Sequence, residues 1–249
     1  MENRVLFTEW GKNIDPENVL SEYPRPQLVR QSWRCLNGYW DYAVTKTAEK
    51  PERYDRKILV PFSPEAPLSG VSRRILPDEF LHYRLCFTYD GAPAAHTILH
   101  FGAVDERCRV YLNGVFIGGH RGGYLPFSFD ISSVLKSGEN VLYLCVRDFS
   151  DSSFHANGKQ TLKRGGIWYT AQSGIWQTVW LEEVPENYIE GIKITSVLKT
   201  GEVIFEIAAK APENADIIIR EHGNSVAEGC ADKSGKAVLK IGAFCPVHP

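Results

Sequence analysis

The 249-residue sequence has no long apolar run and no bias toward one sign of charge. No window approaches the about 18 consecutive apolar residues of a membrane-spanning helix, and the first residues lack the apolar core of a signal peptide. The formal net charge is −2 at pH 7, which gives no electrostatic reason to expect nucleic acid or an anionic membrane as a partner. We therefore expect a cytoplasmic globular protein with neither class of partner.

The common motifs of metal centres and nucleophilic hydrolases are also missing. None of the six cysteines forms a Cys-x-x-Cys pair, and no histidine lies at zinc-finger spacing. Reduced thiols packed as small hydrophobes are therefore expected. The sequence contains no Gly-x-Ser-x-Gly turn, and the adjacent Glu182 and Glu183 would face opposite sides of a strand. We expect no catalytic residue, no metal site and no cofactor in this chain.

Helical periodicity is scarce, with at most a turn or two near Asp15–Ser21. Short apolar runs separated by turn residues predominate, which is typical of an all-β sandwich or barrel. Asn113-Gly114 between two alternating apolar runs predicts a hairpin with a type I′ turn. The strands expected in the first part of the chain are 38–44, 57–62, 81–90, 96–102, the hairpin 108–119, 124–131, 140–148 and 175–184.

A polar segment, 182–191, separates two sets of strands and predicts a domain boundary. The first domain is expected over residues 1–184, with residues 1–30 irregular because they contain prolines that disfavour helices and ladders. The second is expected over residues 185–249. Its expected strands are 192–198, 202–210, 216–223 and 237–241.

Four strands are fewer than the about seven of an immunoglobulin-like sandwich. The second domain therefore looks incomplete, with open strand edges. Ile217–Ile219 is a continuous apolar run, so one face of that strand stays apolar in either register. Exposed edges and apolar patches promote association, so we expect residues 185–249 to be either the less ordered part of the chain or a self-association surface that pairs with another copy in a homo-oligomer.

A 19-residue polar loop, Asp148–Gly166, interrupts the spacing of the strands and leads into a tryptophan-rich segment. Trp176 and Trp180 alternate onto one face of the expected strand 175–184 and would pack against protein. Trp168 and Tyr169 close the loop. They either stack on the apolar face of a sugar ring or plug the loop onto its own sandwich.

Several motifs of the first domain are specific: FGAVD at 101–105, VYLNG at 110–114, GGHRGGYLPFSFDI at 118–131 and SGIWQTVWLEEV at 173–184. With these motifs the chain resembles the N-terminal sugar-binding domain of glycoside hydrolase family 2, the beta-galactosidase and beta-glucuronidase family. The resemblance implies a jelly-roll β-sandwich followed by a partial immunoglobulin-like β-sandwich. It also implies carbohydrate as the ligand.

Members of that family carry two catalytic glutamates on a TIM barrel and hydrolyse O-glycosyl bonds with retention. This chain has no eight strand–helix repeats. By the resemblance it is a non-catalytic portion of such an enzyme, inactive alone, with a C-terminal TIM-barrel domain of the same polypeptide as its partner. Two alternatives stay open: a stand-alone lectin-like carbohydrate-binding module, and a structural β-sandwich that shapes an oligomer.

The resemblance also suggests carbohydrate contacts in the long loop. Several relatives carry an acidic residue six positions before the glycine of the SGI motif, where this chain has Trp168. A stacking residue in that place, or a different acid such as Asp151, would take over its role. Lys159 and Gln160 match a GKQ element and can hydrogen-bond sugar hydroxyls, or serve as solvated surface and as a loop brace. The contact candidates are Asp151, Lys159, Gln160, Trp168 and Tyr169.

Overall fold

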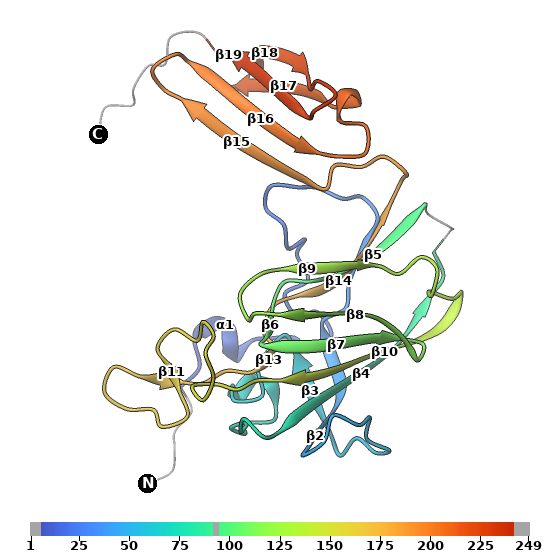
Figure 1. Cartoon of the computed structure of the whole chain (residues 1–249), viewed down its shortest axis with the longest axis vertical. Coiled ribbons are helices and arrows are strands. Elements are labelled where there is room, and N and C mark those ends of the chain that lie inside the picture. Colours follow the sequence, from blue (N-terminus) through green and yellow to red (C-terminus); the bar gives the residue numbers. More distant parts are fainter. Residues whose placement is uncertain (1–5, 92–94, 242–249) are drawn as a thin grey trace. The chain divides into compact units, whose positions relative to one another are not determined.

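The computed structural model describes residues 6–91 and 95–241, and the chain forms two compact units (Figure 1). The first unit contains Arg30–Glu183 and the residues up to Pro24; the second contains Arg25–Val29 and the residues from Val184 onward. Nearly all regular structure is β-strand, which confirms the all-β sandwich class. The helical segments within the described ranges are too short to cross a lipid bilayer. They are α1 (Glu9–Lys12), η1 (Pro67–Ser69) and η2 (Pro212–Asn214).

A six-stranded antiparallel sheet forms one layer of the first unit, with strands in the order β3-β2-β4-β10-β7-β8 (Figure 1). Its longest ladder pairs β4 with β10. The strands are β3 (Arg56–Val60), β2 (Gly38–Thr45), β4 (Phe80–Tyr89), β10 (Gly138–Arg147), β7 (Arg107–Leu112) and β8 (Val115–Arg121).

A four-stranded sheet in the order β1-β14-β5-β9 supplies the other main layer. Its strands are β1 (Trp33–Cys35), β14 (Val179–Val184), β5 (His96–Phe101) and β9 (Phe127–Asp130). Two short pairs accompany it, β13 (Gly174–Ile175) with β6 (Val104–Asp105), and β11 (Gln160–Thr161) with β12 (Tyr169–Thr170). Side chains from both sheets form one core, including Trp40, Tyr83, Leu144, Phe101 and Leu181.

The hairpin between β7 and β8 has the predicted turn. Asn113 and Gly114 both adopt positive φ, 53° and 83°, as a type I′ turn requires. The Asn113 side chain is held at both ends. Its Nδ2 donates to Val134 O at 3.0 Å and to Asn140 Oδ1 at 2.8 Å, and its Oδ1 accepts from Val141 N at 3.0 Å.

Two local predictions for the first unit are wrong. The helical turn expected near Asp15–Ser21 lies instead at Glu9–Lys12, where the Thr8 side chain accepts from Gly11 N as the N-cap. The expected strand 175–184 is two strands, because β13 pairs with β6 whereas β14 belongs to the four-stranded sheet. The chain changes sheets between them, so Trp176 and Trp180 do not share one strand face.

The second unit contains five strands among the described residues, one more than the sequence predicted. The additional strand is β18 (Asn224–Cys230), which pairs with β17. It is polar and contains a glycine, so its own alternation of apolar and polar residues does not predict a strand. The other strands are β15 (Gly191–Val197), β16 (Glu202–Ala208), β17 (Asp216–Glu221) and β19 (Lys236–Lys240). They form the sheets β15-β16-β19 and β17-β18.

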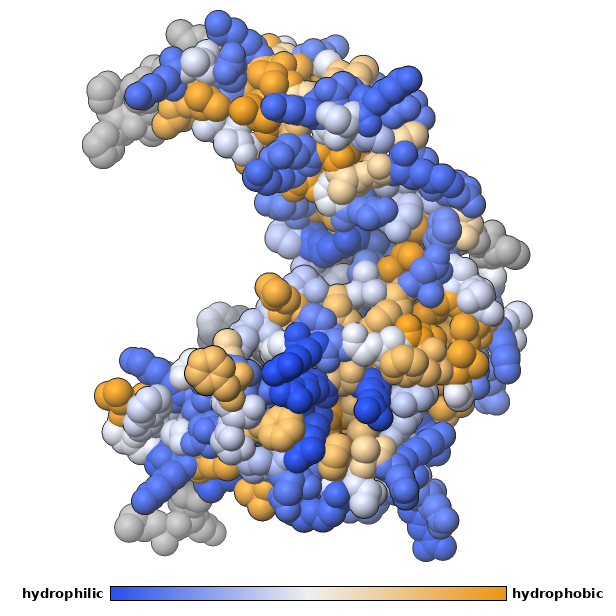
Figure 2. All heavy atoms as spheres, in the orientation of Figure 1, coloured by the Kyte–Doolittle hydropathy of each residue, from blue (hydrophilic) through white to orange (hydrophobic). Residues whose placement is uncertain are grey.

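The small core of the second unit includes Phe205, Ile207 and Ile217. Its edge strand β15 is poorly covered. Ile194 lies opposite the buried Phe205 in the ladder, yet it is 58% exposed. Hydrophobic residues reach the surface in the region of β15 and β16 (Figure 2). The five cysteines in the described ranges are free thiols, and Cys245 lies outside them.

Candidate functional site

Four carboxylates gather at one place in the first unit. Asp105 ends β6, Glu106 follows it, and Asp148 comes directly after β10. Glu65 joins them from the segment between β3 and η1. These residues meet because β7, which follows Glu106, pairs with the last residues of β10.

The cluster is buried and short of donors. Asp105 is 6% exposed, and no hydrogen-bond donor in the described part of the chain is paired with its carboxylate. Burial and the negative charges of Asp148, Glu106 and Glu65 raise the pKa of Asp105 to about 7. Burial likewise raises the pKa of Glu65 to about 7. Asp105 and Glu65 can therefore exist in both protonation states near neutral pH.

Ser173 connects two members of the cluster. Its Oγ lies 2.8 Å from Asp148 Oδ2 and 3.0 Å from Glu65 Oε1, so one hydroxyl proton serves two carboxylates. Its backbone N donates to Glu65 Oε2 at 3.1 Å, and Ser150 N donates to Asp148 Oδ1 at 2.7 Å. Burial raises the pKa of Asp148 in spite of these hydrogen bonds.

An aromatic pair lies next to Asp105. Tyr124 and Trp176 meet edge to face with ring centroids 6.2 Å apart, and Trp176 Nε1 donates to Gly123 O at 2.7 Å. A Cβ at Gly123 would collide with the Asp105 carboxylate, so glycine is required for this close approach. Sugar rings present both hydroxyl groups and apolar faces. A buried carboxyl can hydrogen-bond the hydroxyl groups, and the partly exposed aromatic rings beside it can pack against the apolar faces.

The long loop brings three of the predicted contact residues together. Gln160 in β11 pairs with Tyr169 in β12, and Tyr169 N donates to Lys159 O at 2.9 Å. Gln160 Nε2 donates to the Tyr124 hydroxyl at 3.2 Å, and its Oε1 accepts from Gln172 N at 2.6 Å. Gln160 thus braces the loop and adjoins the aromatic pair, while the side chains of Lys159 and Tyr169 are exposed. Figure 1 shows this β11 loop projecting from the unit.

The other two predicted residues have different surroundings. Asp151 accepts from the Thr161 hydroxyl and from Leu162 N, which lowers its pKa, so this acid closes the loop on itself. Trp168 is 48% exposed and is held through a backbone bridge to Gly165. No contact between these two residues and the carboxylate cluster was found in the described ranges, and their sugar contacts stay predictions.

The buried cluster was not predicted from the sequence. Asp105 was visible as the acid that ends FGAVD, directly after an apolar run, and Asp148 as the first residue of the long loop. Glu65 carried no local signal, because it reaches the cluster only through the packing of a segment far away in the sequence.

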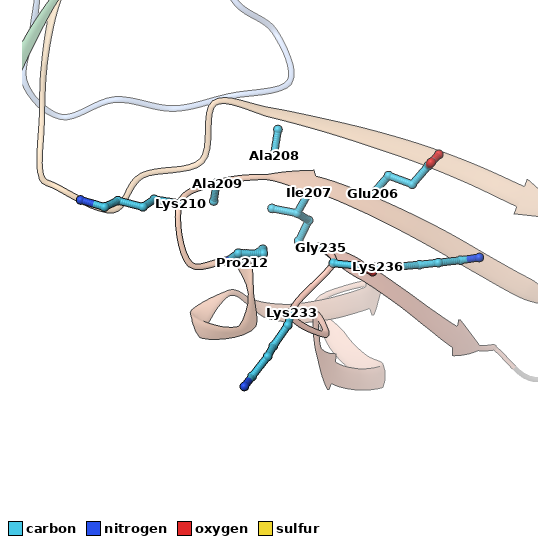
Figure 3. Close-up of a pocket in the computed structure, with 10 residues that line it drawn as sticks. Glu206, Ile207, Ala208, Ala209, Lys210, Pro212, Lys233, Gly235 and Lys236 are labelled. Carbon is cyan, nitrogen blue, oxygen red and sulfur yellow. The ribbon is translucent and has the colours of Figure 1, made fainter.

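A depression in the second unit has a different character. Three of its lining residues are lysines, Lys210, Lys233 and Lys236, and Figure 3 shows their side chains pointing away from one another. Lys210 is already paired with Glu186 at 2.8 Å. No aromatic side chain lines it. The carboxylate cluster and the aromatic pair are therefore the better candidate site.

Known proteins share both sequence and fold with the chain. A family model for the sugar binding domain of glycosyl hydrolases family 2 matches residues 74–185. A putative beta-glucuronidase of Formosa agariphila is 35% identical over 98 residues, which cover 39% of this chain and 11% of that protein. Beta-galactosidase BoGH2A of Bacteroides ovatus is 26% identical over 221 residues, 87% of this chain and 22% of that protein.

Among solved structures, a b-glucuronidase from Ruminococcus gnavus in complex with C6-substituted uronic isofagomine aligns with a TM-score of 0.67 and 20% identity. The alignment covers 90% of this chain and 41% of that one, and at this identity it shows a shared fold. The chain spans between 11 and 22% of the length of the first curated relatives. The matched residues contain the FGAVD and SGIWQTVWLEEV motifs, the aromatic pair and three of the four clustered carboxylates. Residues 74–185 therefore match the sugar-binding domain of glycosyl hydrolases family 2, which confirms the N-terminal sugar-binding region predicted from the motifs.

Proposed function

We propose that the chain is the non-catalytic carbohydrate-binding portion of a family 2 glycoside hydrolase whose whole polypeptide hydrolyses O-glycosyl bonds with retention. The observation that carries the proposal is Asp105, a buried carboxyl without a hydrogen-bond donor, beside the Tyr124–Trp176 pair. With a pKa of about 7, it can donate or accept a hydrogen bond near neutral pH. Sugar hydroxyls do both, so the two groups match.

The charge of the cluster favours a neutral sugar. Glu65, Asp105 and Asp148 all have raised pKa values, first because burial penalises their charged forms, and at Asp105 and Asp148 also because of neighbouring carboxylates. The carboxylate of a uronic acid would add to that charge. We therefore propose a beta-galactoside-like substrate for the whole protein, rather than a beta-glucuronide.

Binding of neutral and acidic sugars tests this assignment. Saturation-transfer NMR of the 249-residue chain is expected to show contact with methyl beta-galactoside and little with methyl beta-glucuronide. Asp105→Asn should weaken the galactoside signal, because a neutral amide oxygen accepts a hydrogen bond from a sugar hydroxyl more weakly than a carboxylate does. The exposed Asp78→Asn is the matched control. Equal signals from both sugars, or an unchanged signal in Asp105→Asn, would overturn the assignment.

The hydrolytic part of the proposal has a separate test. The described residues contain no helix longer than four residues, whereas the catalytic barrel of the family needs eight strand–helix units. The chain alone should leave aryl beta-galactosides intact, and a polypeptide that continues into such a barrel should cleave them. Turnover by the purified chain that resists removal of contaminants would contradict the non-catalytic role.

We also propose that the second unit is the beginning of an immunoglobulin-like sandwich. Its strands form one sheet of three and one of two around Phe205, and the exposed Ile194 lies opposite that residue on β15. Further strands laid against β15 would cover this open side. A longer polypeptide should therefore protect the β15 amides from hydrogen exchange more strongly than the 249-residue chain does.

A further inference from the structure

Glu106, Asp148 and His155 form a triad of metal-ligand type beside the candidate sugar site. One donor atom from each residue lies within 4.8 Å of the donor atoms of the other two. Glu106 lies between β6 and β7, Asp148 follows β10, and His155 comes from the long polar loop. The triad therefore joins the sheet to the loop that carries the predicted sugar contacts.

Two atoms of the triad, one on Glu106 and one on His155, have no hydrogen bond among the described residues, whereas both Asp148 oxygens accept one. Glu106 is 1% exposed, and its Oε2 has no hydrogen-bond partner among the described residues. Oε2 lies 2.9 Å from His155 Nδ1, which is also buried and lacks a hydrogen bond of good geometry. Glu106 Oε1 is satisfied by Arg107 Nε at 2.6 Å. A nearly fully buried carboxylate oxygen thus faces the other two ligands.

The surrounding charge also favours a cation. Glu65, Asp105, Glu106 and Asp148 contribute four carboxylates, and the Arg107 guanidinium opposes them from the surface side. Asp105, next in sequence to Glu106, has no donor of its own. Buried charges are normally paired or bound to metal. A divalent cation would offset the negative charge that the Arg107 guanidinium alone does not balance.

We propose that Glu106, Asp148 and His155 bind a divalent transition-metal ion, with Zn²⁺ as the preferred occupant. An imidazole nitrogen with two carboxylates suits zinc, whereas Ca²⁺ and Mg²⁺ take oxygen ligands alone. Ligands of a tetrahedral zinc ion, each about 2.1 Å from the metal, lie about 3.4 Å apart, so Glu106 Oε2 and His155 Nδ1, 2.9 Å apart, would separate slightly on binding. The donor atoms of the triad lie within 4.8 Å of one another, so the widest of these spacings would shorten by up to ~1.4 Å on binding.

Such an ion would fasten the long loop to the sheet. His155 is the only ligand from the loop interior, while Asp148 and Glu106 lie at strand ends. The site adds a metal where the sequence, judged by cysteine and histidine spacing, predicted none. Asp148 belongs to both the metal site and the charge cluster, but Zn²⁺ binding is measured directly, so the test of the metal site does not depend on the proposed sugar specificity.

Direct detection of the ion is the first test. Chelator-treated chain should bind one equivalent of Zn²⁺ in calorimetry and bind Ca²⁺ more weakly. Crystals grown with Zn²⁺ should show an anomalous peak at the zinc edge between the three side chains. A peak elsewhere, or none at saturating Zn²⁺, would overturn the proposal. A thermal midpoint that does not change on addition of Zn²⁺ would likewise contradict the site.

Variants provide the second test. His155→Gln should weaken Zn²⁺ binding by about 100-fold, since even the loss of outer-shell partners costs about 10–100-fold. His222→Asn is the matched control, because it removes an exposed imidazole in the second unit and asparagine tolerates the positive φ of 47° there. Equal Zn²⁺ affinity in the His155 variant and the control would refute the site. If His155→Gln does not fold, the anomalous map of the wild-type chain decides.

Discussion

At the scale of single residues, Glu182 shows how one buried charge can organise a segment. Its carboxylate accepts hydrogen bonds from Tyr23 Oη at 2.7 Å, Arg30 Nε at 3.1 Å and Trp180 Nε1 at 2.9 Å. His100, stacked on Trp180, lies 3.4 Å away. Although burial alone would raise the pKa of Glu182, these hydrogen bonds hold it well below its usual range. The irregular N-terminal segment is therefore fixed to β14 through this carboxylate.

We expect Glu182→Gln to destabilise the first unit by about 3 kcal/mol, because a neutral amide replaces the buried carboxylate that forms an ion pair with Arg30. Tryptophan fluorescence during urea unfolding measures this unit specifically, since all six tryptophans lie in it. A depressed folded-state pKa contributes stability above the unfolded value of about 4.5, which is lost as the pH falls. The difference from wild type should therefore shrink in acid. Asp78→Asn, at an exposed ion pair, is the control.

Glu65 predicts the opposite pH dependence. Its folded pKa of about 7 lies above the unfolded value of about 4.5. Between these values the folded state binds more protons, so stability falls as pH rises from about 4.5 to 7 and then levels off. Glu65→Gln should flatten this decline between pH 5 and 8, measured by the urea midpoint. An identical slope in wild type and variant would contradict the raised pKa.

At the scale of elements, features set by neighbouring residues were predictable, and features set by distant pairing were not. The Asn113-Gly114 turn follows from two adjacent residues that tolerate positive φ. The break between β13 and β14 was missed because each half pairs with a different sheet. Asp105 and Asp148 likewise come together only through the pairing of β7 with β10. The hydrophobic periodicity of either segment does not reveal which strand it pairs with.

The long loop should exchange its amides unevenly. The Tyr169 amide is bonded to Lys159 O, and Asp151 ties the loop to Thr161 and Leu162. Phe154, by contrast, is fully exposed at the tip. In the metal-free chain, hydrogen exchange followed by mass spectrometry should therefore be faster across 153–158 than at Tyr169. Exchange across 153–158 as slow as in β10 would show that the tip is packed.

At the scale of the whole molecule, the chain has two separate hydrophobic cores of different size. The first unit buries Trp40, Tyr83 and Phe101 within one large cluster, whereas the second relies on a small set around Phe205. Small cores confer less stability. Ile194 and Leu198 are exposed on β15 and at its end, by 58 and 65%, and unpaired edges of this kind recruit other strands.

Unfolding should therefore occur in two steps. Circular dichroism near 218 nm reports strands in both units, while tryptophan fluorescence reports the first alone. We expect the dichroism transition to begin at lower urea than the fluorescence transition, because the second unit melts first. Light scattering at rising concentration should also reveal self-association, reduced by Ile194→Thr. Coincident transitions together with a strictly monomeric chain would contradict both expectations.

The turn at Asn113 bears on how long the molecule remains chemically intact. An asparagine followed by glycine is prone to deamidation, in which the backbone nitrogen of the glycine attacks the carbonyl carbon of the asparagine side chain. Here the carboxamide is held by Val134 O, Asn140 Oδ1 and Val141 N, so the attack requires three hydrogen bonds to break at once. Stored folded protein should keep its asparagine at this position far longer than the same sequence in an unfolded peptide. Peptide mapping by mass spectrometry after warm incubation would measure that difference, and the folded hairpin should slow the deamidation of Asn113.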